Sequence, residues 1–139
     1  MFMKIQRTFI VIPIMMCVLF ANYSTALAVP PFPSSFYGTA KVDGMNVPVG
    51  APITAFINGV QVAFSGTSLY EGETVYSLDV PGDDPTTPAI EGGVAGDTIV
   101  FLVNGQPAQQ TALWQSGSNL MLDLTIPPQT LLFMPAIYK

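Results

Sequence analysis

Alternation of apolar and polar residues is the clearest pattern in this chain. The segments Glu73–Val80 and Ser118–Ile126 place apolar side chains at every second position. A period of two predicts β-strands that turn one face toward a core. In the second segment the side chains expected to point inward are Leu120, Leu122 and Leu124.

Turn signals divide the rest of the chain into similar short runs. Asn58-Gly59 and Asn104-Gly105 each separate two apolar runs, and this pair strongly favours a tight hairpin because both turn residues need positive φ. After residue 28 no apolar repeat near 3.6 persists, and Gly and Pro recur too often for helices. The pattern therefore predicts an all-β sandwich or barrel of seven strands. Pro107 indicates that the strand containing it lies at a sheet edge. The expected strands are Phe36–Val42, Pro52–Ile57, Val60–Gly66, Glu73–Val80, Asp97–Val103, Gln106–Trp114 and Ser118–Ile126.

The two hairpin regions resemble each other. Gly50–Gly59 and Gly96–Gly105 align without gaps, and each is followed by a Ser-Gly pair and a third strand, which contains Ser77–Val80 or Leu122–Thr125. An old duplication and two similar solutions to one geometry explain this equally well. We expect two three-stranded units that face each other in a two-layer β architecture.

The first 28 residues have the features of a secretory signal peptide. Lys4 and Arg7 precede a run without charges, and small residues end the segment at Ala28. A retained membrane anchor is the alternative, but the apolar run is short for a span and Pro13 interrupts it. We predict cleavage after Ala28 and a secreted protein whose mature form does not span a membrane. The expected organisation is a signal peptide (1–28), a Pro-rich segment (29–35), a β-sandwich domain (36–126) and an apolar tail (127–139).

Composition argues against several chemistries. The chain has no histidine, and its one cysteine, Cys17, lies in the predicted signal peptide. Serine–histidine, cysteine–histidine and zinc catalysis therefore lack their side chains, and no carboxylate pair has a spacing that fixes a glycosidase site. After residue 28, two lysines against nine acidic residues give a net charge of −7, which argues against nucleic acid as a partner. We expect a protein that is not an enzyme and has no disulfides.

The segment Phe36–Gln61, "FYGTAKVDGMNVPVGAPITAFINGVQ", resembles the Ig-like/transthyretin-like β-sandwich modules of secreted and cell-surface proteins. Carboxypeptidase regulatory-like domains are their best-known relatives. Tyr76–Gly105 and Ala112–Thr125 resemble a subgroup found in bacterial and archaeal surface proteins. The resemblance covers Phe36–Thr125 and rests on glycines, prolines and turns, which are determinants of fold. It implies a seven-stranded antiparallel sandwich with a role in adhesion, spacing or carbohydrate recognition, and it carries over no catalytic residue.

Acidic residues gather where the two halves join. Ca²⁺ prefers six to eight oxygen ligands, so a calcium site is one hypothesis for this region, and calcium is the single candidate cofactor. The alternative, which we favour, is a solvated crossover loop in which adjacent aspartates form turns. The candidate ligands are Asp83, Asp84, Glu91 and Asp97.

Aromatic residues are the candidates for carbohydrate binding. Tyr70 and Trp114 are the first choices, with Tyr37, Tyr76 and Phe64 as further candidates. The alternative, which we favour, places Trp114 and Tyr76 in the core and leaves Tyr70 as the exposed ring.

The apolar tail suggests self-assembly, because a detached strand can add to an open sheet edge of another copy and build a head-to-tail filament. The alternative, which we favour, is that the tail packs on its own domain or acts as a sorting signal. The candidate assembly residues are Leu131, Leu132, Phe133, Met134, Ile137 and Tyr138.

These patterns together favour a non-catalytic structural or adhesive module at the cell surface. The alternatives are a subunit of an extracellular filament joined by its terminal strands, and a small carbohydrate-binding module. The expected partners are other copies of the chain or other cell-surface proteins, with polysaccharide as a further candidate. The predicted core consists of Phe36, Ile53, Ala55, Ile57, Tyr76, Leu78, Ile99, Phe101, Leu120, Leu122 and Leu124.

Overall fold

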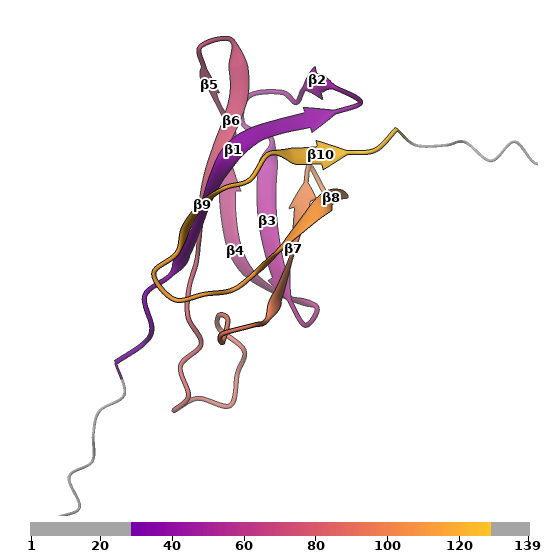
Figure 1. Cartoon of the computed structure of the whole chain (residues 1–139). Helices are drawn as coiled ribbons and strands as arrows, with labels where there is room; N and C mark the ends of the chain where they lie inside the picture. The colour runs from indigo at the N-terminus through magenta and orange to yellow at the C-terminus, as the bar shows by residue number, and fades with distance from the viewer. Residues whose placement is uncertain (1–28, 129–139) are drawn as a thin grey trace, which may run out of the picture.

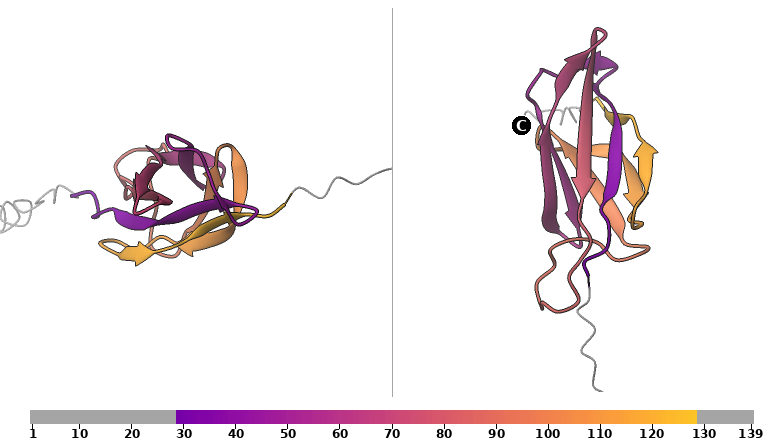
Figure 2. Two further views of the ribbon diagram at one scale, coloured as in Figure 1. Left: turned by 90° about the horizontal axis from the view of Figure 1, so that it is seen from above. Right: turned by 90° about the vertical axis from the view of Figure 1, so that its left-hand side faces the viewer.

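The structure of the protein is a computed structural model, in which residues 29–128 are described. These residues form ten β-strands in two sheets. Figures 1 and 2 show that the two sheets pack against each other. The all-β, two-layer prediction is therefore confirmed. Across residues 29–128 there is no helix with the length and hydropathy needed to cross a membrane. The predicted signal peptide and most of the predicted tail lie outside the described residues.

The first sheet is built around its first strand, β1. In spatial order its strands are β5 (Ser68–Tyr70), β6 (Glu73–Val80), β1 (Ser34–Val42) and then β9 (Asn119–Met121) with β10 (Leu124–Ile126), while β2 (Met45–Asn46) pairs with the end of β1. β1 is antiparallel to β6 but parallel to β9 and β10. The prediction of a purely antiparallel sandwich is thus wrong on this side of β1.

The second sheet is regular. Its order is β4 (Val60–Gly66), β3 (Pro52–Ile57), β7 (Thr98–Val103) and β8 (Gln106–Leu113), and all neighbours are antiparallel. Asn58-Gly59 and Asn104-Gly105 both have positive φ at their turns, which confirms the two predicted hairpins. β8 is an edge strand, as Pro107 indicates.

The number of strands differs from the seven predicted because three short elements escape the alternation pattern. All seven predicted strands are present, but the last is divided into β9 and β10. The other two additions, β2 and β5, belong to small hairpins that turn at Asp43-Gly44 and Glu71-Gly72, where both residues again have positive φ. Strands of two or three residues are too short to show a period.

The internal repeat takes a different form from the predicted one. The two hairpins do not face each other but lie side by side in the second sheet, joined by β3 and β7. Ala55 pairs with Phe101, its counterpart in the repeat alignment, so an approximate two-fold axis passes between them. The third strands, β6 and β9–β10, lie in the first sheet on either side of β1. β1 therefore occupies the axis and has no counterpart.

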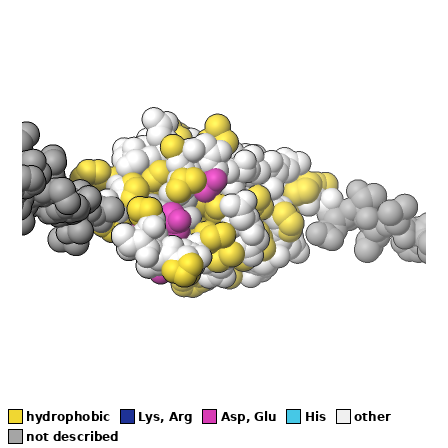
Figure 3. Space-filling model, turned by 90° about the horizontal axis from the view of Figure 1, so that it is seen from below, with side chains coloured by type: hydrophobic (Ala, Val, Ile, Leu, Met, Phe, Trp, Pro, Cys, Tyr) yellow, Lys and Arg dark blue, Asp and Glu magenta, His cyan; other side chains and the backbone are white. Residues whose placement is uncertain are grey.

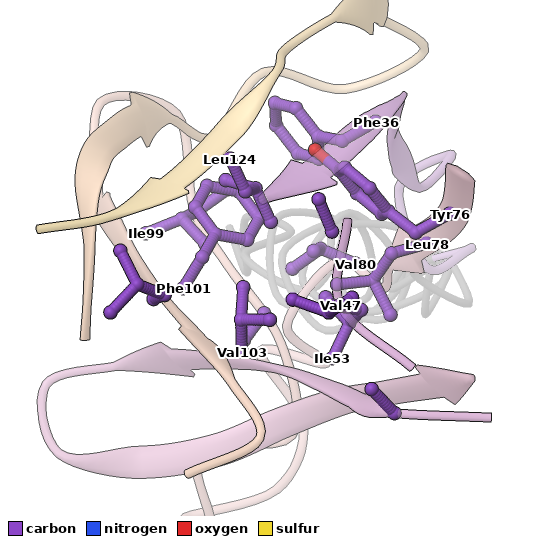
Figure 4. Close-up of a cluster of buried hydrophobic side chains, with 14 of the residues drawn as sticks. Phe36, Val47, Ile53, Tyr76, Leu78, Val80, Ile99, Phe101, Val103 and Leu124 are labelled. Atoms are coloured by element: carbon purple, nitrogen blue, oxygen red, sulfur yellow. The ribbon is translucent and has the colours of Figure 1, made fainter. Parts of the chain in front are cut away.

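The core fills the space between the sheets (Figure 4). Phe36 and Phe101 meet edge to face at its centre, with ring centroids 5.2 Å apart. Nine of the predicted core residues are buried, but Leu122 is half-buried and Leu120 is 47% exposed. The prediction fails at Leu120 because β10 packs against β7 and β8, whereas the main contacts of β9 are with β1. Buried residues outside the predicted core list include Val47, Val80, Val103 and Ile126.

The described chain enters and leaves at opposite ends of the sandwich (Figures 1 and 2). Parallel pairing of β1 and β10 causes this, because the first strand begins at one end and the last strand finishes at the other. The loop between β6 and β7 carries the chain from one sheet to the other, as predicted for the segment that joins the halves.

Candidate functional site

The outer face of the first sheet is hollowed between exposed tyrosines. The hollow has a volume of about 400 Å³, and we call it the tyrosine groove. Tyr37 and Tyr70 are 45% and 64% exposed, and Met121 is 66% exposed. Among the residues that line it, Gly38 has no side chain and Tyr76 is buried, and we call these two its floor. The others, which we call its walls, are Tyr37, Thr39, Tyr70, Val75, Met121 and Asp123.

Strand register brings these side chains together. Tyr37 pairs with Met121 across the parallel ladder, and Thr39 pairs with Val75 across the antiparallel one. Paired residues point to the same face, and the intervening Phe36 points into the core. Tyr70 joins them because the turn at Glu71-Gly72 folds β5 back beside β6. The groove therefore combines three regions that are distant in the sequence: β1, the β5–β6 hairpin, and the segment from β9 to Asp123.

Gly38 allows the chain to approach itself closely at the floor. A Cβ at this position would lie 2.5 Å from the Leu122 carbonyl oxygen, so no larger residue fits without movement. Leu122 donates its N–H to the Tyr37 carbonyl at 2.7 Å. The Leu122 carbonyl in turn accepts a hydrogen bond from the Tyr76 hydroxyl at 2.7 Å. These contacts fix the backbone beneath the groove.

The Asp123 carboxylate takes the place of a backbone carbonyl as hydrogen-bond acceptor. It does so where the parallel pairing of β1 is interrupted between β9 and β10. Its Oδ1 accepts hydrogen bonds from the Thr39 N–H at 2.8 Å and from the Thr39 hydroxyl at 2.9 Å. The backbone bond and then the side-chain bond from Thr39 hold the pKa of Asp123 below its usual value, and Lys41 adds a smaller effect in the same direction. The groove therefore has a carboxylate charge at its edge at neutral pH.

Tyr76 is a structural residue beneath the groove. Burial, followed by the charge of Asp123, raises the pKa of its phenol far above the usual value. The phenol stays protonated and its proton remains in the bond to Leu122. This matches the prediction that places Tyr76 in the core rather than on a binding surface.

Three of the four candidate calcium ligands, Asp83, Asp84 and Asp97, use a carboxylate oxygen in separate loop hydrogen bonds, and Glu91 contributes its backbone N–H to one of these bonds. Asp83 Oδ1 accepts the Glu91 N–H, and Asp84 Oδ1 accepts the N–H and hydroxyl of Thr86, which lower the pKa of Asp84. Asp97 Oδ2 accepts the Val94 N–H at 3.0 Å. Within residues 29–128 no three His, Cys, Asp or Glu side chains are grouped to hold a metal ion. The structure thus does not bring the four together as the calcium hypothesis requires.

The aromatic candidates separate into surface and core. Tyr70 is exposed in the groove, as predicted. Trp114 is buried, and its Nε1 donates to the Val80 carbonyl at 3.0 Å, so it belongs to the core and offers no surface for stacking. The six candidate assembly residues, from Leu131 to Tyr138, lie outside the described residues.

Charge is distributed unevenly over the sandwich. β3, β4, β7 and β8 contain no Asp, Glu, Lys or Arg, and exposed Phe64 and Leu113 lie in the edge strands of that sheet. Lys41 and Glu73 form an ion pair of 2.8 Å on the first sheet. The end of the molecule viewed in Figure 3 displays acidic and hydrophobic side chains and no lysine or arginine. The tyrosine groove is thus on the charged sheet.

Sequence reasoning found Tyr70 but not the rest of this site. The sequence makes Tyr37 only a further candidate and does not by itself identify Gly38, Met121 or Asp123 as ligand contacts. One usable signal exists: the alternation of the last strand predicts that Met121 and Asp123 share an outward face. Only the pairing of β1 with β9 reveals that this face adjoins Tyr37.

Comparisons with known proteins give no match: no family model, no curated protein and no solved structure is significantly similar to this chain. The fold assignment therefore rests on the strands and sheets themselves. The resemblance to Ig-like/transthyretin-like modules stays a prediction.

Proposed function

We propose that this chain is a non-catalytic adhesive or structural β-sandwich module of a secreted or cell-surface protein, and that the tyrosine groove is its binding surface. The observation that carries this proposal is the exposure of two tyrosine rings beside a hollow of about 400 Å³ on a paired sheet. Large apolar side chains at the surface of a small domain favour a binding role when they cluster around a concavity. The lack of histidine in the whole chain supports a role other than catalysis.

Rigidity also supports a binding role. Tyr37 lies in a strand that is paired on both sides, and Tyr70 is held by a two-residue turn. Binding residues on paired strands lose little conformational entropy when a ligand arrives. The groove is thus ordered before any ligand is present.

Adhesion of protein-coated beads tests this function. Beads would be exposed to a panel of microbial cells, cell-surface proteins and purified polysaccharides, with a Tyr37→Ala/Tyr70→Ala double variant beside the unsubstituted protein. We expect the double variant to lose adhesion, because both rings leave the surface. Phe64→Ala is the matched control, since Phe64 is 65% exposed but lies on β4 of the other sheet. Equal adhesion by the double variant and the unsubstituted protein would refute a binding role for the groove.

A second candidate is a subunit of an extracellular filament that exchanges terminal strands. Entry and exit of the chain at opposite ends of the sandwich favour it, because head-to-tail contacts then need no reversal of direction. Deletion of Leu131–Lys139 should abolish higher oligomers in light scattering. An unchanged particle size would contradict this candidate and would leave the adhesion proposal intact.

A further inference from the structure

The chemistry of the tyrosine groove indicates what kind of ligand it takes. Its walls offer tyrosine rings, Val75 and the thioether of Met121, and among the described residues its only charged wall residue is Asp123. An aromatic ring attracts a cation placed over its face within about 6 Å. A groove with two exposed rings and one carboxylate is therefore suited to a positively charged group with an apolar surface.

Two of the four hydroxyl groups that line the groove are committed to hydrogen bonds within the protein. The Thr39 hydroxyl donates to Asp123 Oδ1, and the Tyr76 hydroxyl donates to the Leu122 carbonyl. The hydroxyls of Tyr37 and Tyr70 are left to meet a ligand. A neutral sugar needs several donors and acceptors to replace its bonds to water, and this groove has few to give.

The electrostatic field of the whole domain also favours a positively charged ligand. After residue 28 the chain contains nine acidic residues and two lysines, which gives a net charge of −7. Lys41, one of the two lysines, is already paired with Glu73 at 2.8 Å. Such a field attracts cations to the surface and repels anions.

We infer that the tyrosine groove binds an alkylated ammonium group, such as trimethylammonium, with the group resting on Tyr37 and Tyr70 beside the Asp123 carboxylate. This inference rests on the proposed function of the groove as a binding surface. An alkylated ammonium brings a positive charge and methyl groups but no N–H donors, so it needs little from the committed hydrogen-bonding groups. Two sources offer this chemistry: choline groups on a surface polymer or lipid, and methylated lysine side chains of a protein.

A titration with matched ligands tests the inference. Choline would be compared with 3,3-dimethylbutan-1-ol, which has the same shape but carbon in place of the charged nitrogen, while backbone amide signals are followed by NMR. We expect choline to shift the signals of Gly38, Tyr70 and Met121 in a saturable way and the neutral alcohol to bind more weakly. Equal binding of the two ligands, or choline-induced shifts confined to other regions, would overturn the inference.

Variants and a second pair of ligands complete the test. Tyr37→Ala and Tyr70→Ala should each weaken choline binding by roughly two- to five-fold, as expected for one exposed cation–π contact, and Asp123→Asn should also weaken it. Phe64→Ala should leave choline binding unchanged. A trimethyl-lysine peptide and a phosphocholine-bearing polymer then distinguish the two sources, and binding of either supports the inference. If methyl glycosides shift the groove signals and choline does not, the ligand class is wrong while the binding role stands; bead adhesion that survives loss of both tyrosines contradicts the binding role itself.

Discussion

β6 and the β9–β10 segment occupy equivalent positions in the internal repeat but differ in structure. Continuing the repeat alignment without a gap relates Tyr76 to Leu122 and Leu78 to Leu124. β6 runs unbroken for eight residues, with its alternate residues buried from Thr74 to Val80. Its counterpart is interrupted between Met121 and Leu124, and β9 is exposed throughout. The tyrosine groove lies beside this interruption.

The difference follows from the strand between them. β1 lies on the approximate two-fold axis, and a single strand can be antiparallel to only one of two related neighbours. It is antiparallel to β6 and parallel to β9 and β10. On the parallel side the Thr39 N–H finds a carboxylate instead of a backbone carbonyl. The β9–β10 segment therefore differs from β6, its counterpart in the repeat, because β1 cannot pair with both in the same direction. The tyrosine groove lies at the resulting interruption.

Gly38→Ala should disrupt the contact between β1 and Leu122. Of the proposed substitutions it should lower the free energy of unfolding most. The new Cβ would meet the Leu122 carbonyl oxygen at 2.5 Å, and backbone cannot rotate away as a side chain can. We expect a loss of about 1–3 kcal/mol in the free energy of unfolding, as for other overpacked sites. Urea denaturation followed by Trp114 fluorescence measures it.

Gly66→Ala is the matched control for this substitution. Gly66 lies in β4 of the regular sheet, and a Cβ there would meet nothing within 4 Å. Its effect should stay within about 0.5 kcal/mol. If Gly38→Ala and Gly66→Ala lower the free energy of unfolding equally, the close approach of Gly38 to Leu122 does not matter for stability.

Tyr76→Phe should have a smaller effect and tests the link between the two related strands. The phenol of Tyr76 in β6 reaches over β1 to the carbonyl of Leu122, its own counterpart in the repeat. Removing this hydroxyl leaves the carbonyl without that donor, at a cost of about 1 kcal/mol. Tyr37→Phe removes an exposed hydroxyl instead and should change the free energy of unfolding by less than about 0.5 kcal/mol. Equal effects of the two would mean that the bond to Leu122 adds nothing to stability.

Much of the fold could be predicted because its signals are local. The Asn-Gly turns fix two hairpins, and the alternation of β6 correctly identifies Tyr76 and Leu78 as buried. Leu120 shows the limit of such reasoning. Leu120 and Leu124 belong to the same regularly alternating segment, but burial depends on whether the other sheet covers the strand. No local pattern contains that information.

The groove could not be predicted for a related reason. Tyr37, Tyr70 and Met121 belong to three strands that are far apart in the sequence, and each residue alone reads as an ordinary exposed or core side chain. Their assembly depends on the parallel register of β1 with β9, while the sequence favours antiparallel hairpins everywhere. The cluster of aspartates before Glu91 suggests a ligand site in the sequence instead, although its carboxylates are used for turns.

Asp123→Asn should have the smallest effect on stability. Its pH dependence tests whether the Asp123 charge distinguishes the β9–β10 side of β1 from the β6 side. The asparagine side chain can still accept the hydrogen bonds from Thr39 but has no charge. Because the pKa of Asp123 is lower in the folded protein than in the unfolded chain, its charge stabilises the fold above the unfolded value of about 3.9. That contribution is lost as the pH falls through the lower folded-state pKa. The melting temperatures of the protein and of D123N should therefore differ near neutral pH and converge in strong acid. A difference that persists unchanged at low pH would show that packing at the interruption, and not the Asp123 charge, distinguishes the β9–β10 side from β6.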